Sequence, residues 1–171
     1  MPIDLKSRPN LLPWPPIIFI AAVVAGLALQ YFYPWSLGFG PPRRVLGVAM
    51  IALGLGLDVW AIRTMRRAET NIFPNRAADK LVDYGPFAIS RNPIYLGSTL
   101  VVLGIAGALD SGWFVLAAVA CAGLNYMLAI RREETHMALT FGPAWERYAK
   151  RTPRWIGLGS FRPGDGPARK A

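Results

Sequence analysis

The first residues that could do chemistry lie in the stretch 84–97. A Gly-Pro pair marks a turn there, and Asn92 followed by Pro93 is typical of the start of a helix. A helix that begins at this point presents unpaired backbone N–H groups, which favour an anionic group, and Arg91 adds a charged donor beside them. A simpler interpretation remains open, in which a capped helix places its Arg and Tyr at a membrane interface and binds nothing.

The second group, Arg131, Arg132, Glu133 and Glu134, follows the last apolar run. Two bases suit the C-terminal end of a membrane helix, whereas two acids do not serve that purpose. If the helix continues past Ile130, Glu134 lies one turn further on, where a carboxylate can bind a cation or a pair of hydroxyl groups. An ion pair with a nearby Arg is the alternative. Glu133 points about 100° away on the same helix, so we expect it to matter less.

A third group places Phe141, Trp145 and Tyr148 on one face of a helix. This pattern predicts an amphipathic helix on the membrane surface, which either covers a pocket or lies there without a ligand. Asp58 stands alone inside an apolar run. An intramembrane acid is a candidate functional group, although pairing with Arg63 or with a neighbouring helix is equally open.

The remaining single residues exclude several kinds of site. Cys121 is the one cysteine, so it cannot form an internal disulfide, and we interpret it as a packing residue. His136 is the one histidine, and it predicts no metal cluster. The net charge is +9, but no basic helix interleaved with aromatic residues indicates a nucleic-acid surface. We therefore expect neither a metal nor a nucleic-acid partner.

Long apolar runs must position these groups. The chain has 171 residues, of which 53% are hydrophobic and 17% are charged, where soluble domains have about 25% charged residues. The apolar runs predict an all-α integral membrane protein with about four transmembrane helices and one domain, 1–171. Spanning helices need about 20 residues, or slightly fewer with interfacial anchors. We expect the first to be a retained helix, because no cleavage site of a signal peptide follows it. The four segments are 17–33, 45–62, 93–109 and 113–130.

The basic residues predict the orientation in the membrane. Of the 19 Lys and Arg residues, two precede the first apolar segment, six lie in 63–92 and nine follow Ile130. The entry to the second segment holds the other two. The positive-inside rule then places both termini, the loop 63–92 and the region 131–171 in the cytosol. The loop and the last region would form a cytosolic pocket.

Together these residues resemble the isoprenylcysteine carboxyl methyltransferase family and its phospholipid methyltransferase relatives, as a small bacterial-type member of the inner membrane. The resemblance covers about 81–156. Asn92 stands where many members have His, Trp145 replaces a Tyr, and the better-known eukaryotic relatives have more spans. The first motif matches at Gly85, Pro86, Phe87, Arg91, Asn92, Pro93, Tyr95 and Gly97, and the second at Glu133, Glu134, Met137, Phe141, Gly142 and Tyr148.

The resemblance implies S-adenosyl-L-methionine as methyl donor and a membrane lipid or other lipophilic molecule as acceptor. The acceptor group would be the carboxyl of an isoprenylcysteine-like molecule, oriented by Arg131, Arg132 or Arg154. Alternatives are the ethanolamine headgroup of a phospholipid, another small hydrophobic thiol or acid, or a scaffold without catalysis. The oligomeric state stays open. The implied donor-binding residues are Phe87, Arg91, Asn92, Pro93, Tyr95, Leu96, Gly97, Glu134 and Tyr148.

Overall fold

The computed structural model describes residues 9–10, 12–73 and 75–156, and within these ranges the chain is helical without a strand. Proline begins most of the helices at the first or second position, where its missing N–H costs nothing. The elements are α1 Trp14–Phe32, α2 Pro42–Arg67, α3 Pro86–Ile89, α4 Pro93–Leu109, α5 Gly112–Asn125, the π-helical turn η1 Tyr126–Ile130, α6 Arg131–Phe141 and α7 Pro143–Arg151.

Apolar helices confirm the expected class of an all-α membrane protein. In the described ranges, three helices are long and apolar enough to cross a membrane, namely α1, α2 and the continuous helix Gly112–Phe141. The fourth, α4, is equally apolar but has only 17 residues. At 1.5 Å per residue it covers about 26 Å, close to the hydrocarbon thickness of a thin bilayer.

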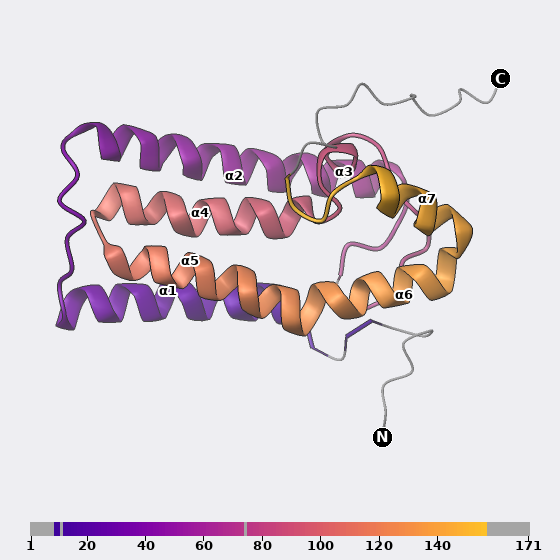
Figure 1. The fold of residues 1–171 in the computed structure, drawn as a ribbon, viewed down its shortest axis with the longest axis horizontal. Helices are drawn as coiled ribbons and strands as arrows, with labels where there is room; N and C mark the ends of the chain where they lie inside the picture. The colour runs from indigo at the N-terminus through magenta and orange to yellow at the C-terminus, as the bar shows by residue number, and fades with distance from the viewer. Residues whose placement is uncertain (1–8, 11, 74, 157–171) are drawn as a thin grey trace.

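The four long helices lie side by side in an order that differs from their order in the chain (Figure 1). α2 packs on α4, α4 on α5, and α5 on α1. Glycines hold α2 and α4 at backbone contact, because a Cβ on Gly54 would lie 2.5 Å from the carbonyl oxygen of Gly97. A Cβ on Gly104 would lie 2.6 Å from the carbonyl oxygen of Gly47. These glycines therefore serve helix packing, as small residues do in membranes.

The end of the bundle with the tight turn between α4 and α5 is fixed by polar contacts. Asp110 ends α4 in the left-handed conformation, with φ 55°, and Arg43 lies 3.2 Å from its carboxylate. Ser111 donates a hydrogen bond of 2.6 Å to Gln30 of α1. These contacts join the two helical hairpins at the end opposite α3, α6 and α7 (Figure 1).

Two helices extend beyond the apolar segments that the sequence defines. α2 continues to Arg67, more than a turn past Ile62, and ends in two bases that suit a helix C-terminus. The last apolar helix passes through η1 into α6 and stops only at Gly142, whose φ of 49° disfavours other residues. The connection between α2 and α4 is correspondingly shorter, and it contains α3.

Candidate functional site

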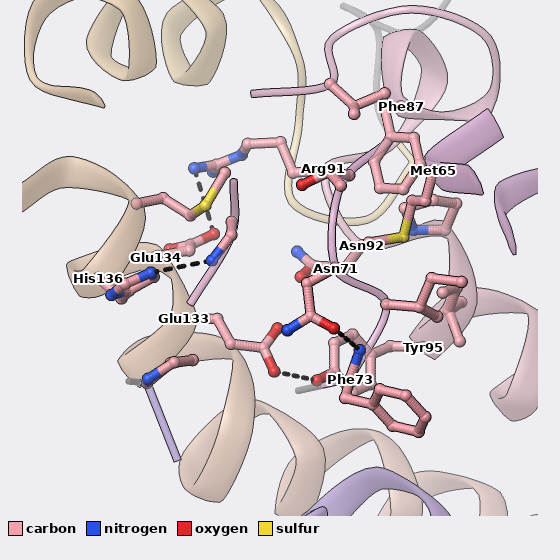
Figure 2. Close-up of a pocket in the computed structure, with 18 of the residues that line it drawn as sticks. Met65, Asn71, Phe73, Phe87, Arg91, Asn92, Tyr95, Glu133, Glu134 and His136 are labelled. Atoms are coloured by element: carbon pink, nitrogen blue, oxygen red, sulfur yellow. Dashed lines mark hydrogen bonds and ion pairs between the residues drawn. The ribbon is translucent and has the colours of Figure 1, made fainter. Parts of the chain in front are cut away.

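A cavity of about 420 Å³ opens at the end of the bundle where α4 and α6 begin. Its walls come from segments far apart in the sequence: the chain before and at the start of α1, the end of α2, the loop that follows it, the start of α4, and the helices α6 and α7. Figure 2 shows side chains from several of these elements converging on it. The lining includes Pro9, Pro15, Pro16, Ile62, Met65, Thr70, Asn71, Phe73, Arg76, Lys80, Val82, Phe87, Arg91, Asn92, Pro93, Tyr95, Glu133, Glu134, His136, Met137, Trp145 and Tyr148.

Most of the donor-binding residues expected from the sequence line this cavity. Leu96 and Gly97 do not. Leu96 lines a second cavity, and Gly97 packs on α2, where a Cβ would meet the Asp58 carboxylate. The expected residues in the lining are Phe87, Arg91, Asn92, Pro93, Tyr95, Glu134 and Tyr148.

The three arginines expected to orient an acceptor are absent from the cavity lining. Arg131 is exposed and Arg132 is half-buried at the start of α6. Arg154 lies behind the cavity, where its guanidinium binds Glu134 through two nitrogens at 2.9 and 2.6 Å. The hydrogen bond to Glu134 raises the pKa of Arg154, so its charge is fixed.

Glu134 is held by two guanidinium groups. Besides Arg154, Arg91 approaches its carboxylate at 3.1 Å. The ion pair that the sequence left as an alternative is therefore present. It joins the segment before α4, the start of α6 and the chain after α7. Because both pairs are largely shielded from solvent, this network is a firm part of the site wall.

Glu133 also lines the cavity, but its hydrogen-bond partners differ from those of Glu134. The Tyr95 hydroxyl donates to its Oε1 at 2.6 Å, and the Asn10 amide donates to the same oxygen at 3.5 Å. Figure 2 shows the pair with Tyr95 at the edge of the cavity. Both donors are neutral, and no ion pair within the described ranges includes Glu133. Glu133 therefore brings to the cavity a carboxyl group that no cationic side chain of the described residues contacts.

Hydrogen bonds to backbone carbonyl groups join the first motif to the chain after α7. Asn92 and Ser90 both donate to the carbonyl oxygen of Arg154, at 3.0 and 3.1 Å. The Arg91 N–H donates to the carbonyl of Pro153 at 2.9 Å. Asn92 stands at the N-cap of α4 as expected, but its side chain does not cap the helix, because its amide is engaged with Arg154.

The amphipathic helix α7 covers the cavity. Its Trp145 and Tyr148 are buried and line the cavity, with their rings in an edge-to-face contact at 5.5 Å. Of the two roles that the sequence left open for this face, the structure shows the pocket wall. Burial raises the pKa of the Tyr148 phenol, which stays protonated and donates to the carbonyl of Phe87 at 2.8 Å.

The loop after α2 forms a further wall of the cavity, as the sequence predicted, although the sequence did not indicate which of its residues take part. His136 is buried on α6, and its Nε2 accepts a hydrogen bond of 3.3 Å from the N–H of Ala78 (Figure 2). Asn71 and Phe73 of the same loop also line the cavity. The sequence did not single out these loop residues because isolated residues in an irregular segment carry no periodic signal. Glu133 was recognised as part of the second motif, but it was expected to matter less than Glu134.

A second cavity of about 440 Å³ lies between α2 and α4 on the apolar flank of the bundle. The segment 86–92 separates the two cavities, since Pro86, Ile89 and Ser90 line the second one while Phe87, Arg91 and Asn92 line the first. The rest of its wall is apolar apart from the Trp60 indole: Ala52, Leu53, Gly56, Leu57, Trp60, Leu96, Leu100 and Ile156.

The family follows from a comparison with known proteins. A family model described as phospholipid methyltransferase matches residues 42–144, well over half of the chain. This chain belongs to the phospholipid methyltransferase family. The matched range contains α2 to α6, and thus Glu133, Glu134 and the segment before α4. The sequence had indicated this family among the relatives of the isoprenylcysteine enzymes, and membership is confirmed at that level.

Two relatives are named for metal resistance. The cobalt-zinc-cadmium resistance protein CzcN of Cupriavidus metallidurans is 33% identical over 111 residues, which cover 64% of this chain and 50% of the relative. The nickel-cobalt-cadmium resistance protein NccN of Alcaligenes xylosoxydans xylosoxydans is 30% identical over 133 residues, covering 67% and 62%. The chain thus spans about half to three fifths of these proteins. No group of three His, Cys, Asp or Glu side chains placed to hold a metal occurs in the described part of this chain.

Proposed function

We propose that this membrane protein transfers a methyl group from S-adenosyl-L-methionine to a lipophilic acceptor drawn from the bilayer. Family membership supports the reaction class. The observation that carries the proposal is the cavity itself, which both sequence motifs line and to which Glu133 brings a carboxyl group that pairs with no cation of the described residues. A volume of about 420 Å³ lies in the range of small-ligand pockets.

The residues in the cavity fit the chemistry of the donor. Bound there, S-adenosyl-L-methionine would supply an electrophilic methyl group on its sulfonium. Glu133 would receive a cationic group of the donor, and Arg91 or the N–H groups at the start of α4 its carboxylate. The aromatic faces of Phe87 and Tyr148 suit the adenine or the positive charge of the sulfonium. Glu134 would act chiefly by holding Arg91 in place.

Catalysis by these residues would consist mainly of positioning. The loop around Asn71, with Trp145 and Tyr148 of α7, would exclude water from the reacting groups. A carboxylate acceptor needs no general base, because it is already ionised at neutral pH. Orientation of two reactants in a dry site supplies a large part of the rate enhancement for such a displacement.

The second cavity supports a lipophilic acceptor. Its apolar wall opens on the flank of α2 and α4, the part of the bundle that meets lipid. A hydrocarbon chain lying there would bring its polar end to the segment 86–92, next to the first cavity. The acceptor we propose first is an isoprenylcysteine-like carboxylate, with Arg154 or Arg91 as the group that orients it.

The orientation in the membrane is part of the proposal. The distribution of Lys and Arg along the chain supports an orientation with the first cavity and both termini on the cytosolic side. The soluble donor would then enter from the cytosol and the acceptor from the inner membrane of a bacterium. No partner protein is needed for this arrangement.

A second acceptor class follows from the description of the family model, which names phospholipids. An ethanolamine headgroup has an ammonium that must lose its proton before methyl transfer, so that activity should rise with pH until the amine is neutral. Carboxyl methylation should show no such rise. The pH profile with each acceptor, together with the alkali lability of the product, separates an ester from a methylated amine.

The direct test of donor binding is a calorimetric titration. Purified protein in detergent should bind S-adenosylhomocysteine, the product of the donor, with one site per chain. An absence of binding under conditions where the protein is folded would contradict the proposal and would favour a scaffold without catalysis. The titration needs no knowledge of the acceptor.

A further inference from the structure

The chain at the start of α1 does more than anchor the first membrane helix. Asn10 has no exposed surface, and Trp14 packs against the buried cluster of Tyr95, Ala129 and Ile130. Three prolines of the same stretch line the site cavity. We call these residues the N-terminal strap: Pro9, Asn10, Trp14, Pro15 and Pro16.

A polar contact between described residues joins the strap to the site. The Asn10 amide donates to Glu133 Oε1 at 3.5 Å, and the Tyr95 hydroxyl donates to the same oxygen at 2.6 Å. The two donors come from the strap and from α4, while Glu133 belongs to α6. Three elements therefore converge on one carboxylate oxygen, across 123 residues between Asn10 and Glu133.

Neutral donors affect a carboxylate differently from cations. They orient it and stabilise its ionised form, but they leave its charge available to a ligand. An Arg or Lys at the same place would orient the carboxylate and also neutralise it. Without a donor, the Glu133 side chain would be free to rotate toward other partners and would lose its preorganisation.

We propose that Asn10 is a positioning residue that holds the Glu133 carboxylate for the cationic group of the methyl donor. This inference rests on the proposed function, because it gives Glu133 a role only if the cavity binds that donor. It assigns the strap, which lies outside the range matched by the family model, to the donor site. Asn10 acts through Glu133 and does not itself touch the reacting atoms.

The test is a double-mutant cycle on the full chain in detergent, with S-adenosylhomocysteine as the probe. Asn10→Ala should weaken binding about tenfold, as expected for loss of a hydrogen bond to a charged group. Glu133→Gln should weaken it at least as much. In the Glu133→Gln background, Asn10→Ala should add almost nothing, because residues that act as a unit are not additive. A purely structural role of Asn10 predicts equal losses in both backgrounds and would overturn the inference.

Asn125→Ala is the matched control. Asn125 is also a buried asparagine, on α5, and its amide donates to the Cys121 sulfur at 3.4 Å. Its loss should leave probe affinity unchanged. If Asn10→Ala fails to fold, Asn10→Asp takes its place, because it keeps the size and replaces the donor with a like charge. Affinity in Asn10→Asp equal to that of wild type would overturn the inference.

The titration of the wild-type protein distinguishes failure of the proposed function from failure of the role proposed for Asn10. Wild-type protein that binds no S-adenosylhomocysteine would overturn the proposed function, and the role of Asn10 with it. Wild-type binding together with unchanged affinity in Asn10→Ala would overturn the role of Asn10 alone.

Discussion

Glu133 and Glu134 are neighbours in the sequence, but their carboxylates have different surroundings. Glu134 meets two guanidinium groups, from Arg91 and Arg154. Glu133 meets the neutral donors of Tyr95 and Asn10. A carboxylate already paired with two cations attracts a third cation more weakly than a carboxylate that is only hydrogen-bonded. We therefore propose that Glu133 binds the cationic group of the donor, and that Glu134 stabilises the wall of the cavity.

The corresponding variants should separate binding from stability. Glu133→Gln should weaken S-adenosylhomocysteine binding by about tenfold or more and change the melting temperature little. Glu134→Gln should lower the free energy of unfolding by about 1–3 kcal/mol, because it leaves two arginines without their carboxylate in a partly buried site. Calorimetric titration and thermal unfolding in detergent measure the two effects.

Glu69→Gln is the control for removal of a glutamate charge, since Glu69 is exposed, does not line the cavity and pairs with Lys80 on the surface. It should change neither quantity measurably. A Glu133→Gln variant with wild-type affinity would remove Glu133 from the donor site. Loss of affinity in Glu134→Gln alone would give that role to Glu134.

The sequence indicated many of these side chains but not how Glu133 would lie. The spacing on a regular helix places Glu133 and Glu134 about 100° apart, and Glu134 one turn past Ile130. The π-helical turn η1 precedes α6 and shifts the faces of the helix that follows. Such a turn, and the opposing Tyr95 and Asn10, belong to tertiary structure and leave no periodic pattern in the sequence.

At the scale of the elements, the apolar runs predicted where the membrane helices lie in the chain. They did not predict the residues at which these helices end. α2 continues through Arg63 to Arg67 because a helix keeps its backbone hydrogen bonds whether or not its side chains meet lipid. Hydropathy reports the lipid boundary, not the end of the helix. The strap, and the individual lining residues of the loop around Asn71, were not predicted for a related reason, since irregular segments are positioned by contacts far away in the sequence.

The glycine contact between α2 and α4 yields an element-scale prediction. Gly47→Ala would place a Cβ 2.5 Å from the Gly104 carbonyl oxygen and would force the helices apart. The expected cost is about 1–3 kcal/mol, equivalent to a fall in melting temperature of roughly 2–12 °C for a chain of this size. Thermal unfolding in detergent measures it.

Gly123→Ala is the matched control, because a Cβ on this α5 glycine meets nothing within 4 Å. It should leave the melting temperature unchanged or raise it slightly, since Ala favours a helix over Gly. Equal melting temperatures for Gly47→Ala and the wild type would contradict the close packing of α2 and α4.

At the scale of the whole molecule, the position of the cavity matters for the proposed reaction, in which the donor comes from water and the acceptor from the bilayer. Figure 1 shows α3, α6 and α7 at one end of the bundle. The first cavity lies at that end, and the second cavity lies between α2 and α4 on the flank. A membrane protein built this way can join a water-soluble donor to a lipid-soluble acceptor without releasing either across the bilayer.

Reporter fusions test the orientation that this account requires. Fusions after Thr70 and at the C-terminus should report the cytosol, and a fusion at Ser111 in the turn between α4 and α5 should report the opposite side. The basis is the gathering of Lys and Arg at the site end of the bundle. A C-terminus on the far side would separate the cavity from its soluble donor and would contradict the proposed direction of entry.

Methyl transfer itself is the most direct test of the central claim. Membrane lipid extract should be incubated with the purified protein and S-adenosyl-L-methionine labelled in its methyl group. We predict label in the organic phase, dependent on the wild-type protein and reduced at least about tenfold by Glu133→Gln at limiting donor concentration. Label that appears in the organic phase equally with and without the folded protein, across extracts from several bacteria, would contradict the account.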